Sequence, residues 1–263
     1  MSSPSSIIAC KEISEALRDR RSLASSLLYT MMGPFIVGLI AFTRASSAKS
    51  AEQSTLLALS SLFLLLSCFT GGMNIAMDTM AGERERRSLL PLLVNPISRV
   101  QLVAGKWISL SMFSLVALLL NLFSFAIVIR HALPSYLAGR SKLLLVGYLL
   151  LAMIPLSTLA AAGELAVSTL SRSVKEAHTW LAFLVFIPMG LGMFLGFHPH
   201  AVGEWSYAVP VLGQQVLLSS LVAGKIPMLS HLAVLCTVTA MGTLSLLRLT
   251  ARLLHRDQVL YGN

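Results

Sequence analysis

The densest group of charged side chains in this sequence follows its second long apolar run, where carboxylates and guanidinium groups alternate. Mixed charges in such a run form ion pairs with each other or with a partner surface, and they match no nucleophile or metal-binding pattern. The residues that we expect to make such contacts are Glu83, Arg84, Glu85 and Arg86.

The charged run continues into a short apolar pattern. Ser88 can act as the N-cap of a helix whose apolar side carries Leu92 and Leu93. This helix must stop before Pro96, because the residue that precedes a proline avoids the α-helical region. The pattern predicts a stiff element on which another protein can dock. An ordinary basic loop that anchors two spans explains it too, and chemistry alone leaves both interpretations open.

Glu164 is the acid that lies deepest within an apolar run, close to the end of that run. A carboxylate inside a membrane is a candidate ion or proton site. Snorkelling towards water, or pairing with Arg172 or Lys175, would also satisfy it. An intramembrane polar site at Glu164 therefore stands beside a purely structural interpretation.

The sequence lacks the patterns that mark catalysis. It has neither a Gly-x-x-x-x-Gly-Lys-Ser/Thr loop for binding ATP nor a Gly-x-Ser-x-Gly elbow for a serine nucleophile. His198, His200 and Glu204 could ligate a metal, but an exposed loop is the simpler explanation because no zinc-enzyme spacing accompanies them. The three cysteines have no paired spacing, so we expect neither a disulfide framework nor a metal site.

These residues are positioned by a chain that is built for lipid. Of its 263 residues, 56% are hydrophobic and only 12% are charged, which is too little polar material to coat a water-soluble globule. Six long stretches lack Asp, Glu, Lys and Arg, and each can cross a bilayer core of about 30 Å as a helix. We therefore predict an all-α polytopic membrane protein with spans at about 23–43, 54–77, 107–129, 143–168, 178–197 and 227–247.

A seventh uncharged run, residues 205–224, is not expected to span the membrane. It carries Pro210, Gly213, Gln214 and Gln215, which suit a bent, re-entrant element before the last span better than a rod that faces lipid. A seventh span would also move the basic residues that follow the last apolar run to the outside, against the positive-inside rule.

Lysine and arginine concentrate before the first span, in the segment 78–106 and after the last span. This distribution predicts that both termini lie in the cytoplasm, with the protein in the inner or plasma membrane. The chain then divides into an arm 1–22, a six-span domain 23–250 and a tail 251–263. We attribute the net charge of +9 to this orientation and to contact with anionic lipids rather than to nucleic-acid binding.

Residues 9–21 of the arm are predicted to form an amphipathic helix on the inner leaflet. Its apolar side carries Ala9, Ile13, Ala16 and Leu17. A solvated cytoplasmic helix would show the same spacing, but a basic trio stands directly before the first span, where lipid phosphates lie. The polar residues assigned to this interfacial helix are Lys11, Glu12, Arg18, Asp19, Arg20 and Arg21.

The segment 83–96 resembles the loop between the second and third spans of type-2 ABC exporter permeases, which carries Glu-Arg-Glu-x-Gly-Thr-x-Glu-x-Leu-x-x-x-Pro. Arg87 replaces the usual glycine and Leu90 the usual second glutamate, so the ionic contact of that glutamate is not expected here. Segment 209–224 resembles the family's re-entrant element, and the tail 256–262 resembles the NatB-like branch, although the large external insertion of that branch is absent. The matching loop residues are Glu83, Arg84, Glu85, Leu92 or Leu93 and Pro96, with Ser88 in the threonine position.

This resemblance implies the permease subunit of an ATP-binding cassette exporter, which pairs with a second permease and moves a substrate that the sequence does not identify. It also implies that segment 83–96 fits a groove on a cytoplasmic ATPase, which binds the ATP and Mg, so that no cofactor is expected on this chain. A second contact with the ATPase is expected at Arg172, Lys175 and Glu176. The alternative function is an ion-coupled secondary transporter that uses Glu164, although such proteins more often carry acids near mid-bilayer.

Overall fold

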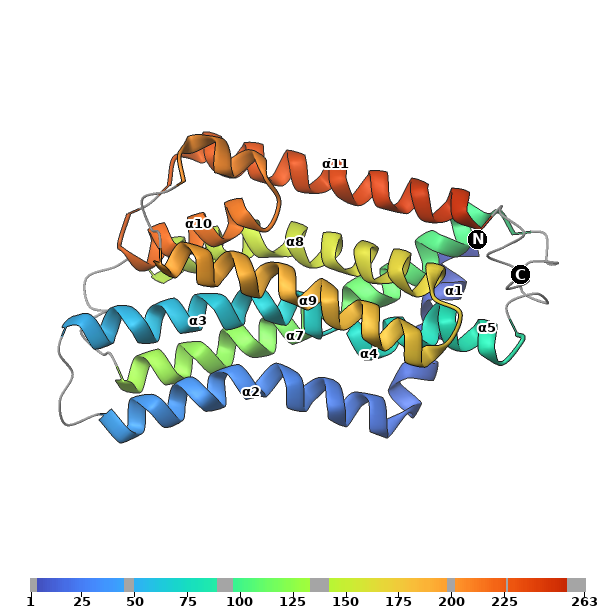
Figure 1. Ribbon diagram of the computed structural model, residues 1–263, viewed down its shortest axis with the longest axis horizontal. Coiled ribbons are helices and arrows are strands. Elements are labelled where there is room, and N and C mark those ends of the chain that lie inside the picture. Colours follow the sequence, from blue (N-terminus) through green and yellow to red (C-terminus); the bar gives the residue numbers. More distant parts are fainter. Residues whose placement is uncertain are drawn as a thin grey trace.

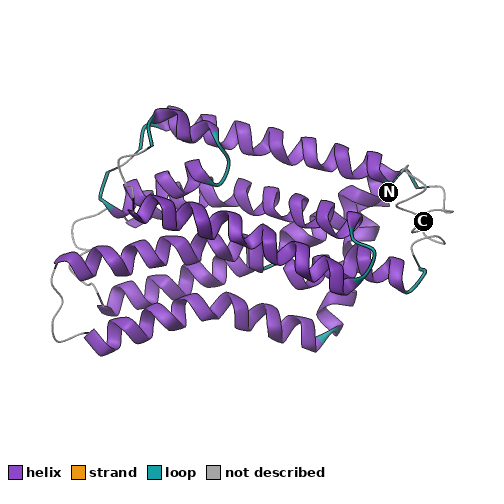
Figure 2. Ribbon diagram, in the orientation of Figure 1, coloured by secondary structure: helices purple, strands orange, loops and turns teal. Residues whose placement is uncertain are grey.

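The computed structural model describes residues 4–44, 50–88, 97–132, 142–197, 202–225 and 227–254. Within these residues the chain is helical and contains no strand, which confirms the predicted all-α fold (Figure 2). The described residues include six helical segments that are long and apolar enough to cross a membrane, and these run side by side along the long axis of the molecule (Figure 1).

The helices follow one another in a simple order. The first candidate span is α2 (Arg20–Arg44), and the second combines α3 (Ser50–Thr70), α4 (Met73–Ala76), η1 (Met77–Gly82) and α5 (Glu83–Glu85). The other four are α7 (Arg99–Ala132), α8 (Lys142–Leu170), α9 (Val174–Phe197) and α11 (Leu229–Leu253). Beside the spans lie α1 (Pro4–Arg18), η3 (Glu204–Ala208) and α10 (Leu212–Val222).

The second candidate span is not one continuous α-helix. Gly71 and Gly72 separate α3 from α4, near the middle of the span. A Cβ on Gly71 would lie 2.4 Å from the Cβ of Ala117, so only glycine lets the backbone approach α7 this closely. Beyond the break the chain passes through η1, a π-helical segment of a kind that often marks functional sites.

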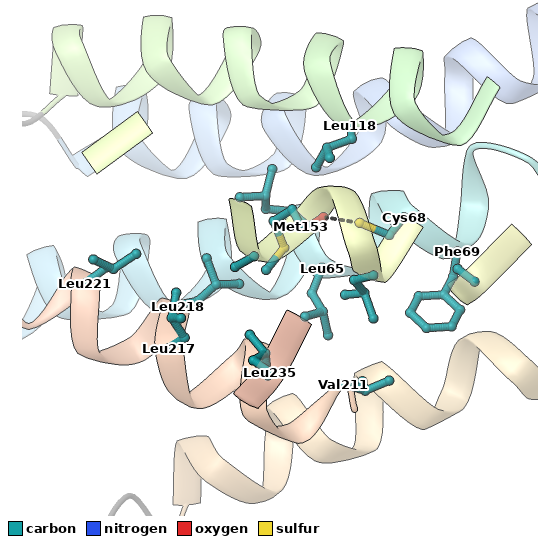
Figure 3. Close-up of a cluster of buried hydrophobic side chains, with 14 of the residues drawn as sticks. Leu65, Cys68, Phe69, Leu118, Met153, Val211, Leu217, Leu218, Leu221 and Leu235 are labelled. Carbon is teal, nitrogen blue, oxygen red and sulfur yellow. Dashed lines mark hydrogen bonds between the residues drawn. The ribbon is translucent and has the colours of Figure 1, made fainter. Parts of the chain in front are cut away.

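The central helix of the bundle is α8, which packs against α3, α7, α9 and α11. Its buried alanines Ala160, Ala161 and Ala162 let neighbouring helices come close, which favours association between helices in lipid. Figure 3 shows one apolar cluster beside α10, where Leu65 of α3 and Met153 of α8 meet side chains of α10 and α11.

A second apolar cluster lies at the opposite end of the bundle. This end, which we call the α5 end, carries α1, α5 and the turn between α8 and α9 at residues 171–173 (Figure 1). Ile8 of α1, Met80 of η1, Val103 of α7 and Leu165 of α8 belong to this cluster. With Leu181 of α9 and Ala251 of α11, this cluster joins the amino-terminal arm to five of the candidate spans.

The arm forms a helix, as expected, but its buried side differs from the prediction. α1 begins at Pro4 and packs against the start of α7 with Ile8, Ala9 and Glu12 buried, whereas Leu17 is 57% exposed. The residue spacing predicted a different buried side because it could not show that the helix packs on protein through its first turns. A Cβ on Gly105 of α7 would lie 2.7 Å from the Cβ of Ile8, which explains the glycine at this crossing.

Asp19 separates α1 from α2 and acts as a cap for the second helix. Its Oδ1 accepts hydrogen bonds from the backbone N–H groups of Arg21 (3.1 Å) and Ser22 (3.4 Å), and its Oδ2 accepts one from the Ser22 hydroxyl (2.6 Å). These bonds, above all the one from the Ser22 hydroxyl, lower the pKa of the exposed Asp19 carboxyl. The first span thus begins with a charged N-terminal cap.

Segment 205–224 contains all but the first residue of η3 and the 11-residue α10, which is shorter than the six candidate spans. Between them, after Pro210, Val211 adopts a positive φ of 71° that is unusual for a β-branched residue. The side-chain oxygen of Gln214 accepts the Val211 N–H at 2.6 Å, and its amide donates to Thr239 of α11 at 3.1 Å. A Cβ on Gly213 would lie 2.5 Å from Leu235 of α11, so α10 packs closely against the last span. Its re-entrant position in a membrane remains a prediction.

Candidate functional site

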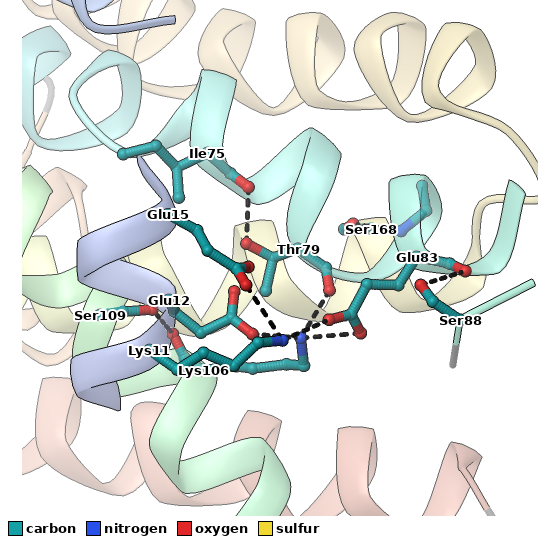
Figure 4. Close-up of polar contacts among 11 residues, drawn as sticks. Lys11, Glu12, Glu15, Ile75, Thr79, Glu83, Ser88, Lys106, Ser109 and Ser168 are labelled. Atoms are coloured by element: carbon teal, nitrogen blue, oxygen red, sulfur yellow. Dashed lines mark hydrogen bonds and ion pairs between the residues drawn. The ribbon is translucent and has the colours of Figure 1, made fainter. Parts of the chain in front are cut away.

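Lys106 is the centre of a buried polar cluster at the α5 end. Its Nζ lies 2.8 Å from Oε1 of Glu12 and 2.9 Å from Oε2 of Glu83, and it donates to the backbone carbonyl of Thr79 at 2.8 Å (Figure 4). The lysine side chain is fully buried, and Glu12 and Glu83 are 8% and 14% exposed. One ammonium group therefore holds α1, η1 and α5 against α7.

Burial makes this cluster sensitive to the loss of any member. A charge removed from water is stabilised only by partners with good geometry, and a buried ion left without its partner is strongly disfavoured. Lys11 adds a second, more exposed cation, which lies 3.8 Å from Glu83 and 3.6 Å from Glu15 (Figure 4). Glu83 thus faces two lysines and is held inside the protein.

Arg84 joins α5 to the C-terminal end of α8. Its guanidinium donates to the backbone carbonyls of Thr169 and Ser171, each at 2.6 Å. The last carbonyls of a helix lack partners within the helix and carry partial negative charge, so an arginine here satisfies them. The two elements are thereby fixed to each other.

Glu85 binds the other side of the same turn. Its Oε2 accepts the backbone N–H of Val174, the first residue of α9, at 3.0 Å. Glu176 stabilises the turn from within, because its Oε2 accepts the backbone N–H of Arg172 at 2.7 Å. The two segments that sequence patterns proposed separately, 83–96 and 171–176, are therefore in direct contact, through Arg84 with Ser171 and through Glu85 with Val174.

Several charged side chains at this end remain exposed. Arg86 forms an exposed ion pair with Asp78 at 2.8 Å, and Arg87, Arg172 and Lys175 are also exposed. Ser88 donates its N–H and its hydroxyl to the carbonyl of Glu83, at 2.9 Å and 3.2 Å. Its predicted capping role towards Leu92, Leu93 and Pro96 involves residues 89–96, which lie outside the described residues, as do His198 and His200.

The expected partners of Glu164 are not found. Its side chain is 1% exposed, and neither carboxylate oxygen has a hydrogen-bond partner among the described residues. It does not pair with Arg172 or Lys175, since the ion pairs of the described chain involve other acids. In the described chain, no three His, Cys, Asp or Glu side chains are arranged to hold a metal ion.

Sequence reasoning missed the role of Lys106. The charge-free runs placed it at the edge of the third span, but α7 begins at Arg99 and carries Lys106 within the helix. The available signal was a lone lysine between apolar residues next to a predicted span, with acidic residues in two neighbouring segments. Pairing it with Glu12 and Glu83 required the packing of α1 on α7.

A model of the family described as "ABC-2 family transporter protein" matches residues 6–204, which contain the polar cluster and the α8–α9 turn. The chain belongs to this family of ABC transporter permeases. It is 30% identical over 188 residues to "ABC transporter permease protein NatB" of Bacillus subtilis, covering 69% of this chain and 48% of that protein. It is 28% identical over 191 residues to "Probable ABC transporter permease protein NosY" of Pseudomonas aeruginosa, covering 70% and 68%. The chain thus spans about half the length of NatB.

Membership of the ABC-2 family identifies the chain as a multi-pass membrane subunit of an ABC transporter. The family does not favour the alternative of an ion-coupled secondary transporter. The polar contacts at the α5 end therefore lie within an ABC transporter permease.

Proposed function

We propose that this chain is the permease subunit of an exporter, driven by ATP that is hydrolysed with Mg on separate cytoplasmic ATPase subunits. The contacts of Arg84 and Glu85 with the α8–α9 turn carry this proposal. A force applied to the α5 end acts on the second span and on α8 and α9 together, because these contacts join them. Motion of an ATPase does work on a membrane domain only through such a stiff connection.

The docking surface consists of the exposed residues around these contacts, together with segment 89–96. Glu83 and Arg84 hold the surface in shape from within, since their side chains bind other parts of the same chain. The exposed side chains that remain for contact with the ATPase are Arg86, Arg87, Arg172 and Lys175. We assign Leu92, Leu93 and Pro96 to the same surface, although segment 89–96 lies outside the described residues.

In the proposed orientation the α5 end faces the cytoplasm. The positive-inside rule supports this, because exposed arginines and lysines gather on α1, α5 and the α8–α9 turn. Arg18, Arg20 and Arg21 are exposed beside the start of the first span and would contact anionic lipid headgroups. The chain's termini would then lie on the cytoplasmic side.

The transport pathway is proposed to form between two permease copies, identical or related, because six spans are half of the twelve that such exporters usually combine. Symmetry would give each copy one ATPase contact.

Co-expression with the ATPase candidates encoded beside this gene tests the proposal. We expect one ATPase to co-purify with the chain and its hydrolysis rate to depend on the permease. Charge reversal at Arg87 and Lys175 should abolish co-purification while membrane insertion stays normal. Lys225→Glu, an exposed reversal beyond α10, is the matched control and should leave the complex intact. A complex unaffected by the double reversal would refute the proposed docking surface.

A further inference from the structure

Glu164 is a buried acid that the proposed coupling does not use. Neither of its carboxylate oxygens is hydrogen-bonded to a described residue, and its side chain is 1% exposed. A carboxylate held away from water and from any cation is strongly disfavoured. The surroundings of Glu164 therefore favour a ligand that neutralises its charge.

Two further oxygens lie beside this carboxylate, on one side of Gly72. A Cβ at position 72 would lie 2.6 Å from Oε2 of Glu164, 2.7 Å from Oγ of Ser114 and 3.5 Å from the carbonyl oxygen of Leu110. These three oxygens come from α8 and α7 and converge at the break in the second span. Because two of these distances are shorter than an ordinary Cβ contact, only glycine lets the second span approach these oxygens this closely.

In α7 the buried serines Ser111 and Ser114 lack the hydrogen bond that the other buried serines of α7 and α8 make, and of these two Ser114 lies beside Gly72. The hydroxyls of Ser109 and Ser157 donate to carbonyls of their own helices, at 2.7 Å and 2.8 Å. Ser114 is fully buried, yet its hydroxyl makes no hydrogen bond to a described residue. Its oxygen is therefore free to act as a ligand, and it lies beside a carboxylate that also lacks a partner.

The break at Gly71 and Gly72 places this group of oxygens deep in the bundle. Ser114 lies near the middle of α7, and Glu164 lies about 9 Å along α8 from that helix's last residue. In membrane proteins, interrupted helices bring backbone and side-chain oxygens to buried cations. The arrangement here has the same elements: a helix break, a carboxylate, a hydroxyl and a carbonyl.

We propose that Glu164, Ser114 and the backbone carbonyl of Leu110, which meet beside Gly72, form a binding site for one monovalent metal cation inside the permease bundle. A single carboxylate supplies one negative charge, which matches a monovalent ion. Ca²⁺ usually takes six to eight oxygens, several of them from carboxylates, whereas Glu164 is the one acid among the three described residues that supply oxygens to this site. Hydroxyl and carbonyl oxygens replace the hydration shell of the ion, as in ion-selective pores.

The site belongs to the permease chain and can be tested without an ATPase, so its failure is distinct from failure of the proposed coupling. The full-length chain in lipid nanodiscs is melted in NaCl, KCl or choline chloride at equal ionic strength and pH. A ligand that binds only the folded state raises the melting temperature as its concentration rises. We expect an increase of at least about 3 °C in NaCl or KCl relative to choline chloride.

Variants separate this site from general salt effects. Glu164→Gln keeps the size of the side chain and removes its charge, so the melting temperature should become equal in the three salts. Gly72→Ala places a methyl group among the three oxygens and should have the same effect, which keeps the test decisive if one variant fails to fold. The matched control is Glu204→Gln, an exposed acid on η3, which should retain the wild-type response.

Three results would overturn the proposal. One is a wild-type melting temperature that is the same in all three salts. Another is a cation response that survives in both Glu164→Gln and Gly72→Ala. The third is a wild-type protein whose stability responds to pH alone between pH 5 and 8 and not to the metal ions, because Glu164 would then bind a proton.

Discussion

Lys106 and Glu83 form a buried ion pair, with 2.9 Å between Nζ and Oε2, that connects the end of the second candidate span to the third. The same ammonium group also binds Glu12 of α1 at 2.8 Å. The amino-terminal arm and the two spans thus share one cation. Movement of α5 is consequently transmitted to α1 and α7 as well as to the α8–α9 turn.

The first prediction concerns Lys106→Met, which removes this cation and keeps an unbranched side chain. Glu12 and Glu83 would then lack their buried partner, so we expect a loss of about 3–5 kcal/mol of stability. Thermal unfolding of the purified chain measures the effect. Lys175→Met removes an exposed lysine from α9 and should change stability by less than about 0.5 kcal/mol.

A triple variant distinguishes lost pairing from lost packing. If Glu12→Gln and Glu83→Gln are added to Lys106→Met, the buried charges disappear together, and much of the lost stability should return. A triple variant as unstable as Lys106→Met would show that the aliphatic packing of the lysine, rather than its charge, maintains the α5 end.

The second prediction concerns Arg84, which donates to the carbonyls of Thr169 and Ser171. Arg84→Ala leaves these carbonyls without their donor, at a cost of about 2 kcal/mol or more. The α8–α9 turn should also move independently of α5, so ATPase stimulation by the permease should fall further than complex formation. Stimulated hydrolysis and co-purification are measured on the same preparations.

Arg84→Lys and Arg87→Ala complete this test. A lysine keeps the charge but replaces the forked donor with a single ammonium group, so it should restore stimulation only in part. The side chain of Arg87 is exposed and makes no hydrogen bond or ion pair with the turn among the described residues, so Arg87→Ala is a control for stability alone and should leave it unchanged within about 0.5 kcal/mol. Full stimulation in Arg84→Ala would rule out this linkage.

The sequence was sufficient to predict the number and type of the spanning helices because a buried charge costs so much in lipid. The charge-free runs therefore marked all six candidate spans. The same reasoning could not pair Lys106 with Glu12, since their contact depends on how α1 crosses α7 at Gly105. It also could not show that Glu164 lacks a partner, because this depends on the orientation of three neighbouring helices.

The third prediction compares two adjacent buried glutamines of α10. Gln214 binds the N–H of Val211, whose φ is positive, and also Thr239 of α11. Gln214→Leu leaves the Val211 N–H unbonded and should destabilise the protein by about 1–3 kcal/mol. Gln215→Leu should cost less, because the side-chain oxygen of Gln215 has no partner among the described residues. Equal losses in thermal unfolding of the two variants would contradict the role assigned to Gln214.

The fourth prediction concerns the cap at Asp19, whose pKa is lowered mainly by the hydrogen bond from the Ser22 hydroxyl. A lowered pKa in the folded state means that the ionised carboxylate stabilises the fold. This contribution is fully present above the unfolded-state pKa of about 3.9 and disappears as pH falls through the lower folded-state value. Asp19→Ala should therefore cost about 1 kcal/mol at neutral pH, as for other caps.

The pH dependence of the difference between wild type and Asp19→Ala is the decisive measurement. Melting temperatures of the two proteins should differ by a constant amount from pH 5 to 8 and should converge below about pH 4, where wild-type Asp19 becomes protonated. Asp19→Asn can still accept backbone N–H groups and should lie between the two proteins without this convergence. A difference that stays constant down to pH 3 would mean that the negative charge of Asp19 contributes nothing to the start of α2.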